Sequence, residues 1–247
     1  MRYFIFFAYD GGNYNGWQKQ PNGITVQEVI ERALSIILRE EITLTGAGRT
    51  DAGVHALDMA AHFDTNTHFD TKQLTQRLNS FLPSDIAINR IVRVKDDAHA
   101  RFDALWRRYE YHITTIKSPF SVGRAAKVYY PLDVEAMNRC AAKLIGRRDY
   151  TSFSKVHTDV NNFVCEIRIA KWTKQGNNLI FTIEANRFLR GMVRAIVGTL
   201  VEIGGGRRNE SEFDAIIEAH NRSKAGEAAE ACGLYFVKAE YKINIYI

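Results

Sequence analysis

The order of strand-like and helix-like segments is the feature that most constrains how this chain of 247 residues folds. Alternating apolar residues indicate strands, and apolar residues three or four positions apart indicate helices. In the first half these patterns predict strands at residues 3–9, 42–45, 56–63 and 86–94, with helices from residue 25 and at residues 71–82. The order strand, helix, strand, strand, helix, strand is the ferredoxin-like plan, in which one face of a sheet carries both helices.

The ends of these two helices are marked by specific residues. Thr25 and Glu28 have the spacing of a capping box, in which two side chains cap backbone N–H groups at the start of a helix. The second helix is expected to stop at Pro83, because proline cannot continue a helix.

The second half repeats the same order without any sequence similarity to the first half. Strands are expected at residues 106–116, 166–173, 179–184 and 234–241, and helices at residues 133–145 and 188–203, with an inserted helix at residues 210–219. No linker rich in Pro and Ser separates the halves, so we expect their sheets to adjoin, with a cleft between them. The expected fold class is therefore α/β (α+β), with an N-terminal half at residues 1–104 and a C-terminal half at residues 105–247.

The chain is moderately basic, with 33 Lys and Arg against 28 Asp and Glu and a formal net charge of +5. Several arginines stand beside aromatic residues, most clearly in Arg107-Arg108-Tyr109-Glu110-Tyr111. Positive charge interleaved with aromatic rings favours a polyanionic partner such as a nucleic acid, although net charge alone is a weak indicator.

Several other classes of protein are not indicated. No apolar run approaches the ~20 residues that a membrane-spanning helix needs, so no membrane is expected as a partner and the cytoplasm is the expected location. Cys140, Cys165 and Cys232 lie far apart and include no Cys-x-x-Cys pair. His55 and His62 are interpreted as structural or surface histidines, and no metal site is expected.

A glycine-rich segment, residues 46–55, lies between two expected strands. Its glycines permit backbone conformations and close approaches that other residues do not. Spacing alone leaves two interpretations open: a functional loop, or a simple turn in which Asp51 caps a backbone amide and Arg49 faces water. Neither Gly-x-x-x-x-Gly-Lys-Ser/Thr nor Gly-x-Gly-x-x-Gly is present in the loop, so chemistry on a nucleoside triphosphate is not expected.

Motifs along nearly the whole chain closely resemble the tRNA pseudouridine synthases of the A type. The motifs are Tyr9-Asp10-Gly11, Gly16-Trp17-Gln18, residues 48–56, residues 79–83, His99-Ala100-Arg101-Phe102, residues 108–111, Phe188, Met192-Val193-Arg194, Ile196-Val197-Gly198 and Gly233-Leu234-Tyr235. The resemblance implies the pseudouridine synthase fold. It also implies isomerisation of uridine to pseudouridine at positions 38, 39 and/or 40 in the anticodon stem-loop of tRNA, without a cofactor, by a homodimer.

The resemblance also implies roles for five residues. Asp51 is the expected catalytic carboxylate and nucleophile, Arg194 its ion-pair partner, and Arg49 the residue that helps evert the target base. Tyr109 is expected to stack on the uracil, and Leu234 to form an apolar wall beside it. Three routes for Asp51 stay open: attack on C1′ of the ribose, attack on C6 of the uracil, or removal of a ribose proton.

Without the resemblance, each of these residues has a simpler interpretation. Arg194 fits a solvated charge on an amphipathic helix, and Arg49 fits a phosphate contact. Tyr109 and Tyr111 fit strand aromatics that share one face, and Leu234 fits core packing.

Two rival functions also remain. Tandem RNA-recognition modules would match the order of elements, although the Lys/Arg-Gly-Phe/Tyr-Gly/Ala-Phe signature is missing. A glycoside hydrolase or nucleosidase would need a second carboxylate, for which Asp10, Asp58 and Asp64 are candidates.

Overall fold

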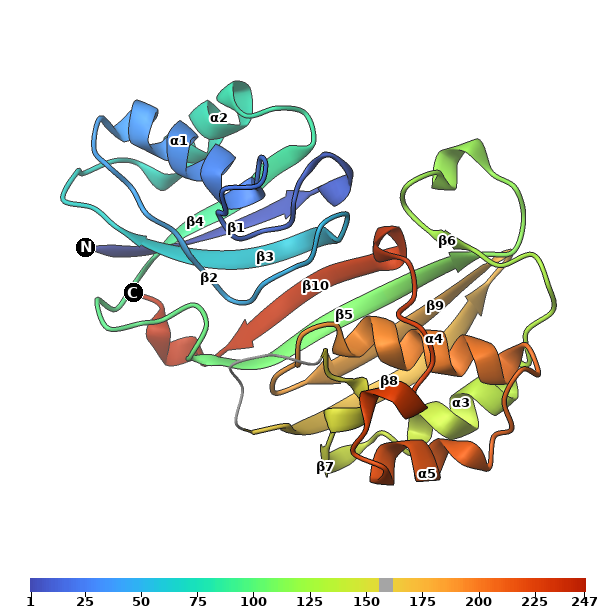
Figure 1. Cartoon of the computed structure of the whole chain (residues 1–247). Coiled ribbons are helices and arrows are strands. Elements are labelled where there is room, and N and C mark those ends of the chain that lie inside the picture. Colours follow the sequence, from blue (N-terminus) through green and yellow to red (C-terminus); the bar gives the residue numbers. More distant parts are fainter. Residues whose placement is uncertain (156–161) are drawn as a thin grey trace. The chain divides into compact units, whose positions relative to one another are not determined.

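The computed structural model describes residues 1–155 and 162–247 and divides into two compact units. Residues Met1–Trp106 together with Tyr235–Ile247 form what we call the N-terminal unit, and Arg107–Leu234 form the central unit (Figure 1). Among the described residues, no helix is long and apolar enough to cross a membrane.

The N-terminal unit is built on a sheet with the strand order β4-β1-β3. Its elements are β1 (Arg2–Tyr9), α1 (Val26–Leu38), β2 (Thr45–Gly46), β3 (His55–Asp64), α2 (Thr71–Phe81), β4 (Ile86–Val94) and most of β10 (Leu234–Tyr241). Strand β1 is antiparallel to both β3 and β4. On the other edge of β3, β10 runs parallel near His55 and β2 runs antiparallel near His62. Helices α1 and α2 lie side by side over one face of this sheet (Figure 1).

The central position of β1 follows from its sequence, which is apolar on both faces. Because side chains alternate between the two faces of a strand, Phe7 points to one face and Phe4 to the other. The Phe7 ring stacks on Trp17 with 5.0 Å between centroids, and the Phe4 ring meets Tyr241 edge-on at 5.1 Å. Both phenylalanines are fully buried, so apolar packing covers the sheet on both sides at β1.

The central unit has a sheet with the strand order β5-β9-β8-β7. Its elements are most of β5 (Ala104–Thr114), β6 (Ala126–Lys127), α3 (Val134–Ala142), β7 (Gly146–Asp149), β8 (Val164–Gln175), β9 (Asn178–Ala185), α4 (Met192–Gly204) and α5 (Glu212–Glu218). Helix α3 packs on β8 and on α4. The Asn138 side-chain amide fixes this packing, because it accepts the backbone N–H of Trp172 at 2.8 Å and donates to the backbone carbonyl of Trp172 at 3.2 Å.

The expected fold class is confirmed, and the N-terminal unit has the expected ferredoxin-like order of elements. The strand expected at residues 42–45 is wrong for residues 42–44, where α1 side chains bind the backbone instead. The Ile42 N–H donates to Ser35 Oγ at 3.0 Å, and the Leu44 N–H donates to Glu31 Oε1 at 2.8 Å. The pairing of this segment with β3 begins at Thr45 and Gly46, opposite His62 and Ala61.

Two further differences concern the second half. The helix expected from residue 188 begins at Met192, because the preceding residues turn and the Met192 N–H donates to the Leu189 carbonyl. The last strand, assigned above to the C-terminal half, pairs through Tyr235 and Phe236 with β3 of the N-terminal unit. Adjoining sheets with a central cleft remain a prediction.

Candidate active site

The glycine loop, residues 46–55, leaves β2 and runs into β3. Thr50 holds it in place on one side of Asp51: its hydroxyl lies 2.8 Å from the Tyr9 hydroxyl, and its carbonyl accepts the Trp17 N–H at 3.2 Å. On the other side, the Val54 N–H donates to the Asp51 carbonyl at 3.2 Å and closes a turn. The backbone that carries Asp51 is therefore fixed at both ends.

Two glycines outside the loop pack directly against it. A Cβ on Gly11 would lie 2.0 Å from the Val54 carbonyl oxygen, and a Cβ on Gly16 would lie 2.4 Å from that of Thr50. Gly16 also has a φ of +84°, a conformation that favours glycine. The motifs around Tyr9 and Trp17 thus form a cradle for the glycine loop, a role that no spacing in the sequence indicates.

Arg49 and Asp51 differ in exposure although they are two residues apart. The Arg49 side chain is exposed, and Asp51 is half-buried. The structure thus brings these two predicted residues together in one anchored loop, with the cation on the solvent side.

His55 is the last residue of the loop and is buried, as expected for a structural histidine. Its Nδ1 accepts the Gly11 N–H at 3.1 Å, and its ring stacks on Tyr235 with 4.7 Å between centroids. Among residues 1–155 and 162–247, no group of three or more His, Cys, Asp or Glu side chains is placed to hold a metal ion.

Tyr109 lies on β5 of the central unit and is 8 % exposed. The Phe188 ring meets it edge to face, at 5.0 Å between centroids and 83° between planes. Tyr111, two residues along the strand, is also buried, and its hydroxyl donates to the Glu230 carbonyl at 2.9 Å. The two tyrosines share a strand face, as the simpler interpretation of the sequence expects.

Arg194 lies in the first turn of α4 and is half-buried. Its Nε donates to the Ala229 carbonyl at 2.6 Å, and the Ala229 N–H donates back to the Arg194 carbonyl at 2.9 Å. Burial raises the pKa of Tyr111, and the charge of Arg194 opposes that shift. Arg194 is therefore a half-buried charge whose guanidinium is held by a backbone carbonyl of the central unit.

Leu234 is 7 % exposed and begins β10. It directly follows the segment that Arg194 and Tyr111 hold through Ala229 and Glu230. The five predicted residues thus fall into two groups, Arg49 and Asp51 in the N-terminal unit and the other three in the central unit.

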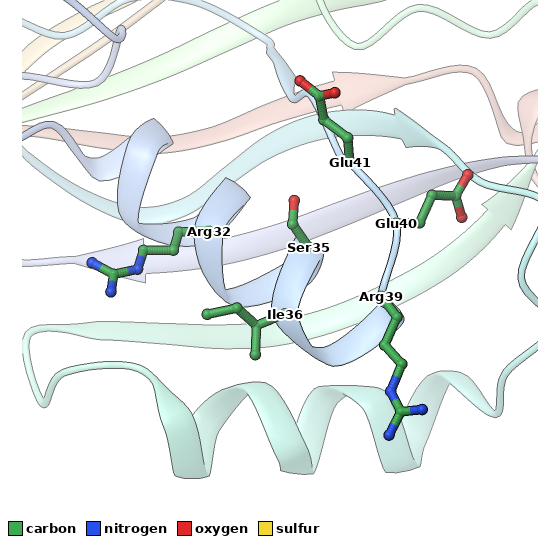
Figure 2. A pocket seen from close by; sticks show the side chains of 6 residues that line it. All are labelled: Arg32, Ser35, Ile36, Arg39, Glu40 and Glu41. Atoms are coloured by element: carbon green, nitrogen blue, oxygen red, sulfur yellow. The ribbon is translucent and has the colours of Figure 1, made fainter.

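A separate hollow of about 440 Å³ lies at the C-terminal end of α1 (Figure 2). Figure 2 shows that its side chains diverge instead of converging on one point. It is lined by Arg32, Ser35, Ile36, Arg39, Glu40 and Glu41. None of the predicted site residues contributes to it, so it is not part of the candidate active site.

Comparison with known proteins agrees with the resemblance seen in the sequence motifs. A family model described as tRNA pseudouridine synthase matches residues 5–103 and 140–242. The tRNA pseudouridine synthase A of Bacteroides fragilis is 50% identical over 248 residues, covering 100% of this chain and 98% of that protein. The protein of the same name from Bacteroides thetaiotaomicron is 51% identical over 249 residues (100% and 93%), and that from Colwellia psychrerythraea is 41% identical over 246 residues (99% and 95%).

The chain therefore belongs to the tRNA pseudouridine synthase A family. Members of this family are isomerases, so the chain is an enzyme. The resemblance seen in the sequence is confirmed, and the two rival classes, a non-catalytic RNA-binding protein and a glycoside hydrolase, are set aside.

Proposed function

We propose that this chain converts uridine to pseudouridine at positions 38, 39 and/or 40 in the anticodon stem-loop of tRNA, with Asp51 as the catalytic carboxylate. The observation that carries the proposal is the anchored glycine loop, in which Thr50 and Val54 fix the backbone on both sides of Asp51. Catalytic groups work best when the surrounding structure already holds them in place.

The reaction needs no oxidant, reductant or cofactor. The bond from ribose C1′ to uracil N1 breaks, the base rotates, and C1′ joins C5. The C5 hydrogen then leaves as a proton and N1 ends with one proton, so atoms and electrons balance within the substrate. This chemistry leaves the protein to bind the tRNA, expose the base and supply a carboxylate.

Arg49 is proposed to help expose the base. A uridine in a stem is stacked and paired, and flipping it out costs ~a few kcal/mol. The Arg49 side chain is exposed at the rim of the loop that carries Asp51. A planar guanidinium at that position can occupy the space that the base leaves in the stack.

Arg194 is proposed to keep Asp51 ionised. Burial disfavours a charged carboxylate, and a nearby cation favours it. The hydrogen bond from Arg194 Nε to the Ala229 carbonyl fixes the plane of the guanidinium, which supports a role as an oriented ion-pair partner. Asp51 then attacks C1′ or C6, or removes a ribose proton; each route requires the ionised carboxylate.

Tyr109 and Leu234 are proposed to hold the everted uracil between a ring and an apolar wall. Both are at least nine-tenths buried, so little of either surface is open to a base before tRNA binds. We therefore expect the pocket around Tyr109 to open when tRNA binds. Phe188, in contact with the Tyr109 ring, is the neighbour expected to move.

The partners follow from the same proposal: tRNA as the substrate, a second copy of the chain in a homodimer, and the cytoplasm as the location. A net charge of +5 is compatible with a polyanionic substrate. In a dimer, one tRNA could rest across both subunits.

The test uses tRNA tritiated at C5 of its uridines. Pseudouridine formation releases that tritium to water and leaves the base attached to the RNA. Tritium release without free uracil supports the proposal. Free uracil would instead indicate a nucleosidase, and no release would indicate a binding protein.

A further inference from the structure

The loop of residues 95–103, between β4 and β5, displays an aromatic ring and a cation on the surface of the N-terminal unit. Phe102 is 74% exposed, and Arg101 is exposed beside it. The Arg101 guanidinium carbon lies 5.8 Å from the centre of the Phe102 ring. The roles proposed above use neither residue.

Hydrogen bonds within the loop fix the backbone beneath these two side chains. His99 Nδ1 accepts the N–H of Arg101 at 3.1 Å and that of Phe102 at 3.2 Å. The Asp103 carboxylate accepts the His99 N–H at 2.7 Å, and the Asp103 N–H donates to the His99 carbonyl at 3.0 Å. The His99 ring also contacts the Phe102 ring, with 4.3 Å between centroids.

Side chains from three strands hold the backbone of the loop in place. Ala100 donates its N–H to His62 Nδ1 of β3 at 3.1 Å, and its carbonyl accepts the Tyr241 hydroxyl of β10 at 2.6 Å. The Arg2 side chain of β1 donates to the Ala98 carbonyl at 3.0 Å. The loop is therefore organised before any partner arrives, and a preorganised surface loses little conformational entropy on binding.

Two of the three carboxylates of the loop are engaged in its support, and the third, Asp97, is exposed four residues before Arg101. Asp96 pairs with Arg93 at 2.7 Å, and Asp103 accepts the His99 N–H. Phe102 and Arg101 together present an aromatic face beside a positive charge. That pair matches a nucleotide, because every base offers a flat face for stacking and every linkage a phosphate for a guanidinium.

The position of the loop separates it from the catalytic carboxylate. His62, which anchors the loop, lies seven residues beyond His55 along β3, a distance of about 23 Å at the ~3.3 Å rise of a strand residue. A base that stacks on Phe102 is therefore a different base from the target uridine.

We propose that Phe102 and Arg101 form a second tRNA contact, in which Phe102 stacks on an unpaired base and Arg101 binds a neighbouring phosphate. The inference rests on the proposed function for its substrate, and it adds a binding site distant from the chemistry.

The test is equilibrium binding of a fluorescein-labelled, unmodified tRNA transcript, followed by anisotropy in an Asp51→Asn background so that the RNA stays unmodified. Phe102→Ala is expected to raise the Kd about tenfold, the usual effect of losing one base–aromatic stack. Phe102→Trp is expected to retain affinity. The matched control is Phe120→Ala, which removes an 87% exposed ring from the central unit and is expected to change nothing.

Salt dependence separates the two roles. Arg101→Gln is expected to reduce the slope of log Kd against log salt by about one released counterion, whereas Phe102→Ala is expected to leave that slope unchanged. With Asp51 intact, Phe102→Ala is expected to raise KM for tRNA and to keep kcat.

An unchanged Kd for Phe102→Ala would overturn the inference, as would an equal loss in Phe120→Ala. A change of sedimentation without a change in tRNA affinity would also overturn it, because it would make Phe102 a protein contact. Tritium release by the unaltered chain tests the proposed function separately, so failure of one claim is distinguishable from failure of the other.

Discussion

At the scale of single residues, the position of Asp51 depends on close backbone contacts that Gly11 and Gly16 make with the glycine loop. The glycine loop and its Asp51 stand out as a motif, and the resemblance assigns them a role. The cradle residues Gly11 and Gly16 touch the loop across the fold, and a close approach of this kind leaves no mark in residue spacing. Arg194 shows the converse, because a helical pattern suggests a solvated side chain whereas Ala229 binds it.

Gly16→Ala tests the cradle. The added Cβ would meet the Thr50 carbonyl at a residue with φ +84°, so we expect a loss of ~1–3 kcal/mol in unfolding free energy. The rate of turnover should also fall, because the displaced Thr50 carbonyl is next to Asp51. Urea unfolding and single-turnover assays measure the two effects.

Gly48→Ala is the matched control for stability, since a Cβ there meets nothing within 4 Å. Equal unfolding free energies for the two variants would contradict the assignment of Gly16 to the cradle.

Tyr109→Phe separates the ring from the hydroxyl. The ring and its contact with Phe188 remain, so tRNA affinity should be kept. Turnover should fall about 100-fold if the hydroxyl moves a proton in the reaction. Full turnover would show that only stacking matters, and weakened binding would contradict the stacking role.

At the scale of elements, periodicity predicted most helices and strands but not what each would pair with. Thr25 caps α1 as the capping box predicts, through its bond from the Glu28 N–H. Residues 42–44 have strand-like sequence, yet α1 side chains take the N–H groups of Ile42 and Leu44. The partner of β10 was equally hidden, because an apolar pattern predicts a strand without specifying its neighbour.

His62 of β3 makes the anchoring of the 95–103 loop dependent on pH. Burial, with the charges of Arg2 and His99, lowers the pKa of His62 to about 4, and Asp64 and Asp103 oppose the shift. The unfolded chain, with a His pKa near 6.5, takes up a proton that the folded chain excludes. Stability is therefore full above about pH 6.5 and falls as the pH drops toward 4.

The expected loss between about pH 7.5 and about pH 5 is ~2 kcal/mol from this residue. His62→Gln keeps an acceptor for the Ala100 N–H and removes the titration, so its unfolding free energy should change less over that interval. Identical pH dependence in the two proteins, measured by urea unfolding, would contradict the assignment.

At the scale of the whole molecule, the proposed enzyme joins an anchored carboxylate in the N-terminal unit to an aromatic and cationic group in the central unit. The sequence predicted the residues of both groups through motifs that lie far apart in the chain. The central claim is that residues of both groups act on the same uridine. The proposed contact at Phe102 adds a second binding site for the same RNA.

The most direct measurement is tritium release from C5-labelled tRNA by the Asp51→Asn variant, together with its tRNA affinity. Amide and carboxylate have nearly the same shape, so the proposal predicts normal tRNA binding and no tritium release above background. Continued release by Asp51→Asn would contradict the claim that this carboxylate performs the reaction.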